Sequence, residues 1–537
     1  MNSKKKFSLL LVLTLVLSMF LVACAGGSDD KGGEKSGTTE GKENEAVIGG
    51  DLVIATLSDA AMLDPHLSTD VPSINIQQNI FETLIAKDKD ENLVPGLATS
   101  WEPVDETTWV FELREDVTFH DGEKFNAEAA KKNFDRILDP NISAPRAFLF
   151  DMVTEFKVVD EYKLQITTEY PFAPILAHLT HPVGAIISPK SIDEDYAAIE
   201  DGKEAGSVIN SHPIGTSYFK FENWNQGTEI KLARNDDYWG DIPFLDTVTV
   251  KAIPEGGTRL AELETGHAQI IEPVQPSEVQ LIDGSEFGTV DNTTSSSLSY
   301  VSFNLEKAPF DNLKVRQAVS MLINQDDILN GIYEGHGVAA VGPLAPGVFG
   351  YDESMKPLSY DPEAAKELLK EAGFEDGFKT TIWTNDNQQR MDMAVLVQQE
   401  LKKANIEVDI EVVEWGAYLD KTAKGEHDMF ILGLSNPVGD ADYFLSQLFD
   451  SANKGLAGNR SFYDNPKVDE LLKAGSQEID ETARQAIYSD IQEILIEEAP
   501  MVYVHHQAYL TGVSNNIEGY WINSSGYYKL QHVKFVE

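Results

Sequence analysis

The sequence contains almost no cysteine, because Cys24 is the only one among 537 residues. An internal disulfide needs two thiols, and the common structural zinc sites use several thiolates, so the chain has neither. The lone cysteine must therefore be explained by its place in the chain and not by a partner.

Basic residues are also scarce. The chain has 42 Lys and Arg residues against 88 Asp and Glu residues, which gives a formal net charge of -46. Such a charge repels phosphate backbones, so nucleic acid is excluded as a natural partner. Solubility outside the cell is the simpler explanation of the acidity.

Catalytic motifs are absent from the sequence. It has no G-x-S-x-G elbow, no H-E-x-x-H pair and no phosphate-cradling glycine loop. His178 and His181 could share a helical face and bind a metal, but no Cys, Asp or Glu lies within four residues of them, which favours structural histidines. No pair of carboxylates is marked by its spacing as an acid/base dyad. We therefore expect no catalysis, metal or cofactor.

A hydrophobic run at residues 7–22 follows lysines at 4–6. This order is typical of a secretory signal, and the run is shorter than a comfortable membrane span. Cys24 directly follows Leu-Val-Ala, which resembles the lipobox of bacterial lipoproteins, where this cysteine is lipidated and becomes the mature N-terminus. A chance cysteine in an ordinary signal is the alternative. The lipobox interpretation leaves no thiol for nucleophilic catalysis.

Residues 25–46 are rich in Gly, Ser, Thr, Lys, Glu and Asp and have no apolar periodicity. Such a segment cannot bury a core and is expected to form a flexible tether. The remaining body of roughly 490 residues exceeds what one hydrophobic core supports, so two or more lobes are expected.

The region 406–444 favours a ligand site. Residues 406–413 alternate as a half-solvated strand does, residues 417–423 suit a short helix, and residues 427–434 end in an apolar run typical of a doubly buried strand. The polar loop 435–442 then follows the carboxyl end of that strand, where open α/β sheets bind ligands. An ordinary surface turn is the alternative, because Asn, Pro, Gly and Asp are common turn residues.

Other elements follow from periodicity and turn residues. We expect a strand at 50–55, the loop 57–65, a helical segment at 75–85, a strand at 109–113, a partner strand at 117–120 with a turn at Asp121-Gly122, and a helix at 127–137 capped by Asn126.

One block carries a family resemblance. The run AxSWEPxDxxTWxFxLRxxVxFHDGxxFNAEAxxxNFxR, from Ala98 to Arg136, resembles the signature of the extracellular solute-binding proteins that serve dipeptide, oligopeptide, nickel and glutathione ABC importers. Further blocks follow in the family's order at 213–216, 234–239, 303–304, 315–318, 359–366, 413–415 and 463–469.

The resemblance implies an α/β two-lobe periplasmic-binding-protein-like fold of the large class, with mixed sheets, a hinge of crossing strands and an extra subdomain in lobe one. The expected division is a signal peptide at 1–23, a lipidated Cys24 and tether at 24–46, lobe one at 47–302, lobe two at 303–504, and a return segment of lobe one at 505–537.

The residues support part of this independently. Residues 300–304 and 501–509 are apolar and strand-like, and two strands that cross between sheets make a hinge suited to closure. Residues 361–372 and 393–404 are amphipathic helices that precede strands, as in βαβ units.

A receptor for a peptide-like ligand should offer an acid, a base and small polar loop groups. In peptide-binding relatives a basic residue pairs with the ligand carboxylate, and Arg390 is the nearest match; alternatively, Arg390 makes only surface contacts. Trp415 and Trp383 are expected to be apolar walls. The candidate ligand contacts are Ala60, Ala61, Met62, Trp383, Asn385, Arg390, Trp415, Ser435, Asn436 and Asp440.

One departure from the family pattern matters. In dipeptide and oligopeptide binders an Asp that holds the peptide amine usually stands three residues after the position of Leu434, and here Pro437 takes its place. The resemblance is therefore closer to glutathione-binding or less-defined peptide-binding members, and Asp440-Ala441-Asp442 resembles a downstream family element.

We predict a non-enzymatic, monomeric receptor, lipid-anchored on the extracytoplasmic face of the membrane, that captures di- or oligopeptides or glutathione and delivers them to an ABC-importer permease. A Gram-positive-type cell fits best, or the periplasmic side where there are two membranes. The alternatives are a nickel-type metal-chelate binder with cleft histidines, an adhesin or signalling protein on this scaffold, and a secreted hydrolase.

Overall fold

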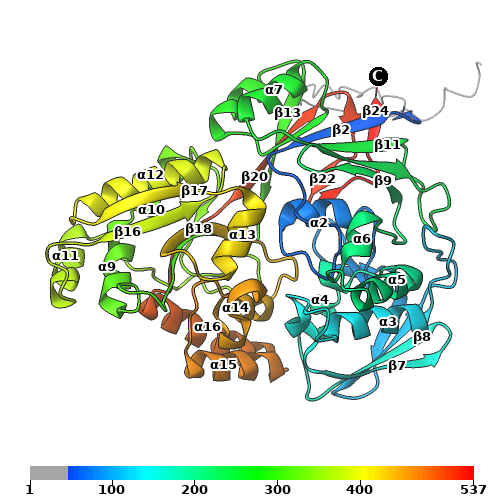
Figure 1. Ribbon diagram of the computed structural model, residues 1–537, viewed down its shortest axis with the longest axis horizontal. Coiled ribbons are helices and arrows are strands. Elements are labelled where there is room, and N and C mark those ends of the chain that lie inside the picture. Colours follow the sequence, from blue (N-terminus) through cyan, green and yellow to red (C-terminus); the bar gives the residue numbers. More distant parts are fainter. Residues whose placement is uncertain (1–45, 537) are drawn as a thin grey trace, which may run out of the picture. The chain divides into compact units, whose positions relative to one another are not determined.

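The computed structural model describes residues 46–536 (Figure 1). The predicted signal, Cys24 and nearly all of the predicted tether lie outside the described residues. Among the residues that are described, no helix is both long enough and apolar enough to cross a bilayer.

A seven-stranded mixed sheet occupies the upper part of Figure 1. In spatial order its strands are β13 (Gly288–Thr294), β20 (Ala508–Ser514), β12 (Ile270–Glu272), β2 (Asp51–Thr56), β11 (Thr247–Ala252), β10 (Glu229–Arg234) and β9 (Phe219–Asn225). β2 is parallel to β11 and β12, whereas β20 is antiparallel to β12 and β13. The sheet is therefore completed by a strand from the far end of the chain.

A six-stranded mixed sheet lies to the left in Figure 1. Its strands are β15 (Val338–Ala339), β19 (Met501–His506), β14 (Leu298–Phe303), β18 (Met429–Leu434), β16 (Lys379–Thr384) and β17 (Glu407–Val412). β16 is parallel to β17 and β18. Alternate side chains of β18 enter two different hydrophobic cores, because Phe430 and Leu432 pack on one side and Met429 and Ile431 on the other. The predicted double burial of this strand is confirmed.

The chain passes directly from a strand of one sheet to a strand of the other at two places. β13 of the first sheet continues through residues 295–297 into β14 of the second, and β19 of the second continues through Gln507 into β20 of the first. These crossovers form the predicted hinge of crossing strands. The first lies before the predicted segment 300–304, which belongs almost entirely to β14 of the second sheet.

A four-stranded antiparallel sheet forms the predicted extra subdomain. Its order is β5 (Ala98–Pro103), β6 (Thr108–Leu113), β8 (Lys163–Thr168) and β7 (Val153–Asp160). Helix α3 (Ala127–Leu138) covers it, since the ring of Phe134 stacks on that of Phe156 at a centroid distance of 4.5 Å. Asn126 caps this helix through Ala129 N, as predicted.

The remaining strands are short, and the other elements are helices. The strands are β1 (Ala46–Val47), β3 (Ile85–Lys87), β4 (Leu93–Pro95), β21 (Ile517–Glu518), β22 (Trp521–Ile522), β23 (Tyr528–Lys529) and β24 (Lys534–Val536). The α-helices are α2 (Val71–Gln77), α4 (Ile175–His178), α5 (Pro189–Glu200), α6 (Ser207–Ser211), α7 (Gly256–Glu264), α8 (Val279–Asp283), α9 (Leu313–Leu322), α10 (Gln325–Gly331), α11 (Pro362–Glu371), α12 (Gln388–Lys402), α13 (Trp415–Ala423), α14 (Ala441–Phe449), α15 (Pro466–Gln477) and α16 (Glu481–Glu498). The 3-10 helices are η1 (Ala147–Phe150), η2 (Pro182–Gly184), η3 (Pro276–Glu278), η4 (Ser451–Asn453) and η5 (Gly455–Ala457).

Two local predictions are wrong. The helical segment expected at 75–85 is displaced to α2, because the Asp70 side chain caps an earlier start and the Ile80 carbonyl accepts a hydrogen bond from outside the helix. The partner strand expected at 117–120 is only an isolated bridge of Thr118, although the turn that follows it is present.

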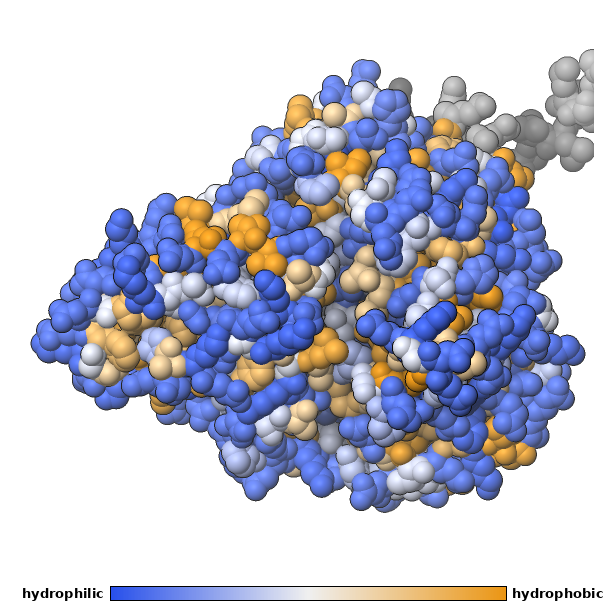
Figure 2. Space-filling model, viewed as in Figure 1, coloured by the Kyte–Doolittle hydropathy of each residue, from blue (hydrophilic) through white to orange (hydrophobic). Residues whose placement is uncertain are grey.

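A buried ion cluster holds the loop after β2. Arg136 of α3 is fully buried, and its Nη2 lies 2.6 Å from Asp64 Oδ2 and 3.0 Å from Asp195 Oδ2. Its Nη1 also lies 2.9 Å from His66 Nδ1. The outer surface is different in character: the face in Figure 2 is mostly hydrophilic, with hydrophobic residues in small groups.

Candidate functional site

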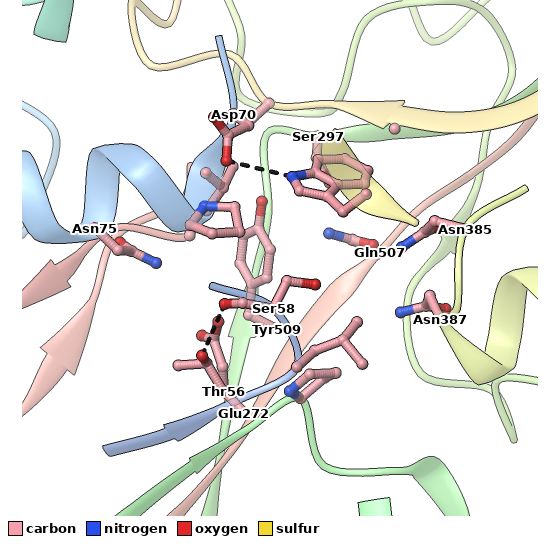
Figure 3. Close-up of a pocket in the computed structure, with 18 of the residues that line it drawn as sticks. Thr56, Ser58, Asp70, Asn75, Glu272, Ser297, Asn385, Asn387, Gln507 and Tyr509 are labelled. Carbon is pink, nitrogen blue, oxygen red and sulfur yellow. Dashed lines mark hydrogen bonds between the residues drawn. The ribbon is translucent and has the colours of Figure 1, made fainter. Parts of the chain in front are cut away.

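A cavity of about 250 Å³ lies where the two large sheets meet (Figure 3). The segments after β2, β12, β16 and β18 line it, so parallel strands of both sheets present their carboxyl ends to one space. Ser297 and Gln507 from the two crossovers also line it, so the hinge forms part of the wall. A water molecule needs only about 10–15 Å³, and the cavity therefore admits a much larger solute.

Acidic side chains reach the cavity from the first sheet. Asp59 is already engaged, because its Oδ2 accepts a hydrogen bond from Trp224 Nε1 at 2.9 Å. Asp70 caps α2 and accepts a hydrogen bond from Trp415 Nε1 at 3.3 Å, drawn as a dashed line in Figure 3. Burial raises the pKa of Asp70.

Glu272 is the third acid of the cavity and ends β12. Burial raises the pKa of its carboxyl to about 7, although the nearby Tyr528 hydroxyl and the positive charge of Arg259 oppose that rise. Glu272 can therefore change its charge near neutral pH.

Arg390 and Trp415 form the wall on the side of the second sheet. Arg390 is half-buried in the first turn of α12, and its Nη1 donates to Asn385 Oδ1 at 3.0 Å. Its guanidinium lies 5.7 Å from the Trp415 ring centroid, within cation–π range. No carboxylate of residues 46–536 makes an ion pair with it within 4.0 Å. Arg390 is therefore free to receive an external carboxylate.

Two further arginines line the cavity and are almost fully buried, Arg146 at 3% and Arg460 at 5% exposure. Arg146 Nη1 donates to Ala457 O at 2.7 Å. Arg460 Nε and Nη2 have no hydrogen-bond partner in the described part of the chain.

A family model described as "Bacterial extracellular solute-binding proteins, family 5 Middle" matches residues 92–455. The chain belongs to this family. Two proteins named "Glutathione-binding protein GsiB" are 32% identical to it: that of Pectobacterium atrosepticum over 481 residues, 88% of this chain and 91% of the relative, and that of Salmonella typhimurium over 486 residues, 89% and 93%. The family resemblance predicted from the sequence is confirmed.

Solved structures of similar proteins agree with the fold of this family 5 member. The "ABC transporter-associated periplasmic binding protein DppA" of Helicobacter pylori, in complex with peptide STSA, has a TM-score of 0.84 and 32% identity, and the match covers 91% of this chain and 99% of that one. The oligopeptide-binding protein AppA of Bacillus subtilis, in complex with a nonapeptide, has a TM-score of 0.85 and 25% identity, with 92% and 100% covered. The predicted two-lobe binding-protein fold is confirmed.

The structure brings half of the predicted contacts of this solute-binding protein to the cavity. Those that line it are Ala60, Asn385, Arg390, Trp415 and Ser435. Those outside the lining are Ala61, Met62, Trp383, Asn436 and Asp440. Ligand contact stays a prediction for both groups, and the structure places only the first group at this cavity.

Three of the residues outside the cavity lining make contacts within the protein instead. Trp383 is 7% exposed and packs in a core. Both carboxylate oxygens of Asp440 accept hydrogen bonds from Arg484, at 2.6 and 2.8 Å. Asn436 Oδ1 accepts a hydrogen bond from Gly439 N at 2.9 Å, which shapes the loop. Asn436 and Asp440 therefore stabilise this loop, whereas Ser435 at its start lines the cavity.

Ala61 and Met62 also lie outside the cavity lining, and their backbones bind another part of the protein. Their backbone N–H groups donate to Ser73 Oγ, at 2.9 and 3.1 Å, which ties the loop after β2 to helix α2. Ala60 and the residues just before it, Leu57, Ser58 and Asp59, are the part of this loop that lines the cavity.

The histidine pair considered for a metal has other contacts. His178 Nε2 lies 3.1 Å from Asp442 Oδ2, and His181 Nε2 lies 3.2 Å from Tyr443 Oη. Among residues 46–536, no group of three or more His, Cys, Asp or Glu side chains is arranged to hold a metal ion. The pair links a segment near η2 to α14.

Sequence reasoning missed Arg146, Arg460 and Glu272. Glu272 ends a strand of only three residues, which is too short to show a period. Arg460 stands three residues before the family block that begins at Tyr463, and this proximity was the one available signal.

Proposed function

We propose that this solute-binding protein captures peptides or peptide-like solutes, glutathione among them, in the cavity between its sheets and delivers them to the permease of an ABC importer. It binds them without transforming them and acts as a monomer with two closing lobes. One lobe consists of the segments before residue 295 and after Gln507, and the other of the segment between the two crossovers.

The observation that carries this proposal is the opposite charge of the two cavity walls. Glu272 comes from the first sheet and Arg390 from the side of the second, and Glu272 lies across the space from the Asn387 cap of α12 in Figure 3. A peptide-like solute carries an amine and a carboxylate, which match these walls. The names of the relatives, which include glutathione-binding and peptide-bound proteins, agree with such a solute.

The test is to denature the purified body, identify any released compound by mass spectrometry, and titrate ligand-free protein with glutathione and with di- and tetrapeptides in a calorimeter. Tryptophan fluorescence follows the same titrations through Trp415. Absence of any peptide-like compound, together with no heat from any of these probes, would refute the proposal. Conversion of a probe during incubation would refute the non-enzymatic part.

We further propose that Cys24 is the lipid attachment point and that the body stands on the extracytoplasmic face of the membrane. Replacing Cys24 with alanine should release the protein into the medium, because one lipid-modified residue supplies the anchor. Cell fractionation measures this. Retention of the Cys24→Ala protein in the membrane fraction would contradict it.

The raised pKa of Glu272 predicts a pH dependence of binding. Below about pH 7 its carboxyl is protonated in the free protein. Affinity for a ligand with a free α-amine should therefore rise with pH up to about 7, by as much as tenfold per unit, and level off as the amine itself loses its proton near 7.7–8.0. Calorimetry from pH 5.5 to 8 measures the slope.

The groups around Glu272 keep this prediction specific. Tyr509, Tyr520, Tyr528 and Arg259 are its titratable neighbours, and burial raises the pKa of each tyrosine, so none changes charge in this range. Glu272→Gln should flatten the slope, and an N-acetylated ligand should show none. A slope that survives in Glu272→Gln would assign it to another group.

A further inference from the structure

Arg146 and Arg460 are cationic groups in a place where charge is costly. Both are more than nine-tenths buried, yet neither makes an ion pair within 4.0 Å with any carboxylate of the described residues. Desolvating a guanidinium without a counter-charge is unfavourable. A fold that retains two such groups beside one cavity needs a reason other than stability.

The two arginines differ in how much the protein satisfies them. Arg146 donates to Ala457 O, and the Gln447 amide accepts from both of its Nη atoms at 2.8 Å when that amide is oriented to donate to Tyr443 Oη. Arg460, by contrast, has two guanidinium nitrogens without a partner in the described residues. The unmet hydrogen-bonding capacity therefore sits mainly on Arg460, with Arg146 held in place next to it.

Their positions along the chain are also informative. Arg146 precedes η1, next to the four-stranded sheet, and its partner Ala457 ends η5, three residues before Arg460. The Arg146 guanidinium thus contacts the short loop from which the Arg460 side chain extends. The positive charge of Arg146 adds to burial in lowering the pKa of Arg460, in agreement with this proximity.

We propose that Arg146 and Arg460 form a second anion-binding subsite of the cavity, in addition to Arg390, and that the solute carries a second carboxylate that binds there. This inference rests on the proposed function and narrows it to peptide-like solutes with two acidic groups. A planar carboxylate matches the paired N–H donors of a guanidinium, so Arg460 supplies a bidentate contact and Arg146 adds charge.

The subsite also explains how such a solute closes the protein. Arg146 belongs to the segment before the first crossover, and Arg460 to the segment between the two crossovers. A carboxylate bound by both joins the two sides of the hinge. Binding energy at this subsite therefore favours the closed arrangement.

The experiment uses Arg146→Met and Arg460→Met, which keep most of the side-chain volume and remove the charge. Arg316→Met is the matched control, because Arg316 is 6% exposed, lacks an ion pair within the described residues, and lies outside the cavity, where its donors bind Phe310 O and Glu498 O. Removing an unpaired charge should leave the melting temperature of Arg460→Met unchanged or higher, whereas Arg316→Met should melt lower.

The probes are glutathione and the dipeptide Ala-Glu, each with its two monoamides. Wild-type protein should bind each diacid at least tenfold more tightly than either monoamide. Arg460→Met should lose at least tenfold in affinity for the diacid, but it should bind one of the two monoamides as tightly as wild type does. Arg390→Gln should lose affinity for the diacid in the same way and keep its affinity for the other monoamide. Arg146→Met should weaken binding of the same two ligands as Arg460→Met. The monoamide whose affinity is unchanged in a variant shows which carboxylate the replaced arginine binds.

The outcomes separate the two proposals. If no probe binds wild-type protein, the proposed function fails and the subsite falls with it. If probes bind but Arg460→Met and Arg146→Met bind the diacids as tightly as wild type, the subsite alone is refuted. If sodium chloride or acetate alone raises the melting temperature of wild type as much as the diacids do, the pair holds a small free ion, which also overturns the assignment.

Discussion

Replacing Arg136 with leucine should lower the free energy of unfolding by about 3–5 kcal/mol, the cost of breaking a buried ion pair from one side. Arg136 is fully buried, and both Asp64 and Asp195, which it contacts, are fully buried as well. Leucine would leave these carboxylates without a counter-charge. His66 is a poor replacement for its charge, because burial is the main cause that holds the pKa of His66 well below its usual value.

Urea denaturation measures the loss, and Arg234→Leu is the matched control. Arg234 also contacts two carboxylates, those of Asp236 at 2.7 Å and Asp246 at 2.8 Å, but it is 24% exposed and its partners are more exposed still. Exposed pairs contribute about 0–1 kcal/mol. Equal losses in the two variants would show that burial of the Arg136 cluster carries no extra stabilisation.

Replacing Arg390 with glutamine should weaken binding of a carboxylate-bearing ligand by about 2–3 kcal/mol and barely affect its amidated analogue. Arg390 makes no ion pair within residues 46–536, so its charge is available. The Asn385 side chain orients its guanidinium, and Trp415 lies within cation–π distance. Inside a water-poor cavity such an ion pair is much stronger than at a surface.

Calorimetric titration of wild type and Arg390→Gln with free and amidated peptides decides this prediction. Asn387→Ala is a useful second variant, because it removes the cap of α12 without touching the guanidinium. Equal losses for free and amidated ligands in Arg390→Gln would exclude a carboxylate role for Arg390.

Local patterns predicted the elements around the site better than the site itself. The alternation and turn residues of 406–434 correspond to β17, α13 and β18 within a few residues, because each depends on neighbours in sequence. The loop after β18 was expected from the same pattern. Ser435 at its start does line the cavity.

The predicted contacts that lie outside the cavity, and the arginine that sequence reasoning missed, have a common physical explanation. Asp440 looks like a ligand contact until its partner Arg484, 44 residues further on, is placed beside it. Trp383 alternates correctly as a strand residue, but helix α13 covers the face on which it lies, as its packing in the same core as Tyr418 shows. Arg460 is informative only once it is known to be buried and unpaired. Burial and distant pairing are tertiary properties, and one sequence does not display them.

The place of β20 in the seven-stranded sheet has a consequence for the order of folding. β20 lies between β12 and β13, and β13 pairs with no other strand among the described residues. Until residues 508–514 have been synthesised, β12 keeps an open edge and β13 has no neighbour. The first sheet is thus begun by β2 near the start of the described residues and can be completed only near their end. Such a chain stays incompletely folded for most of its synthesis, a state that suits passage across a membrane before folding.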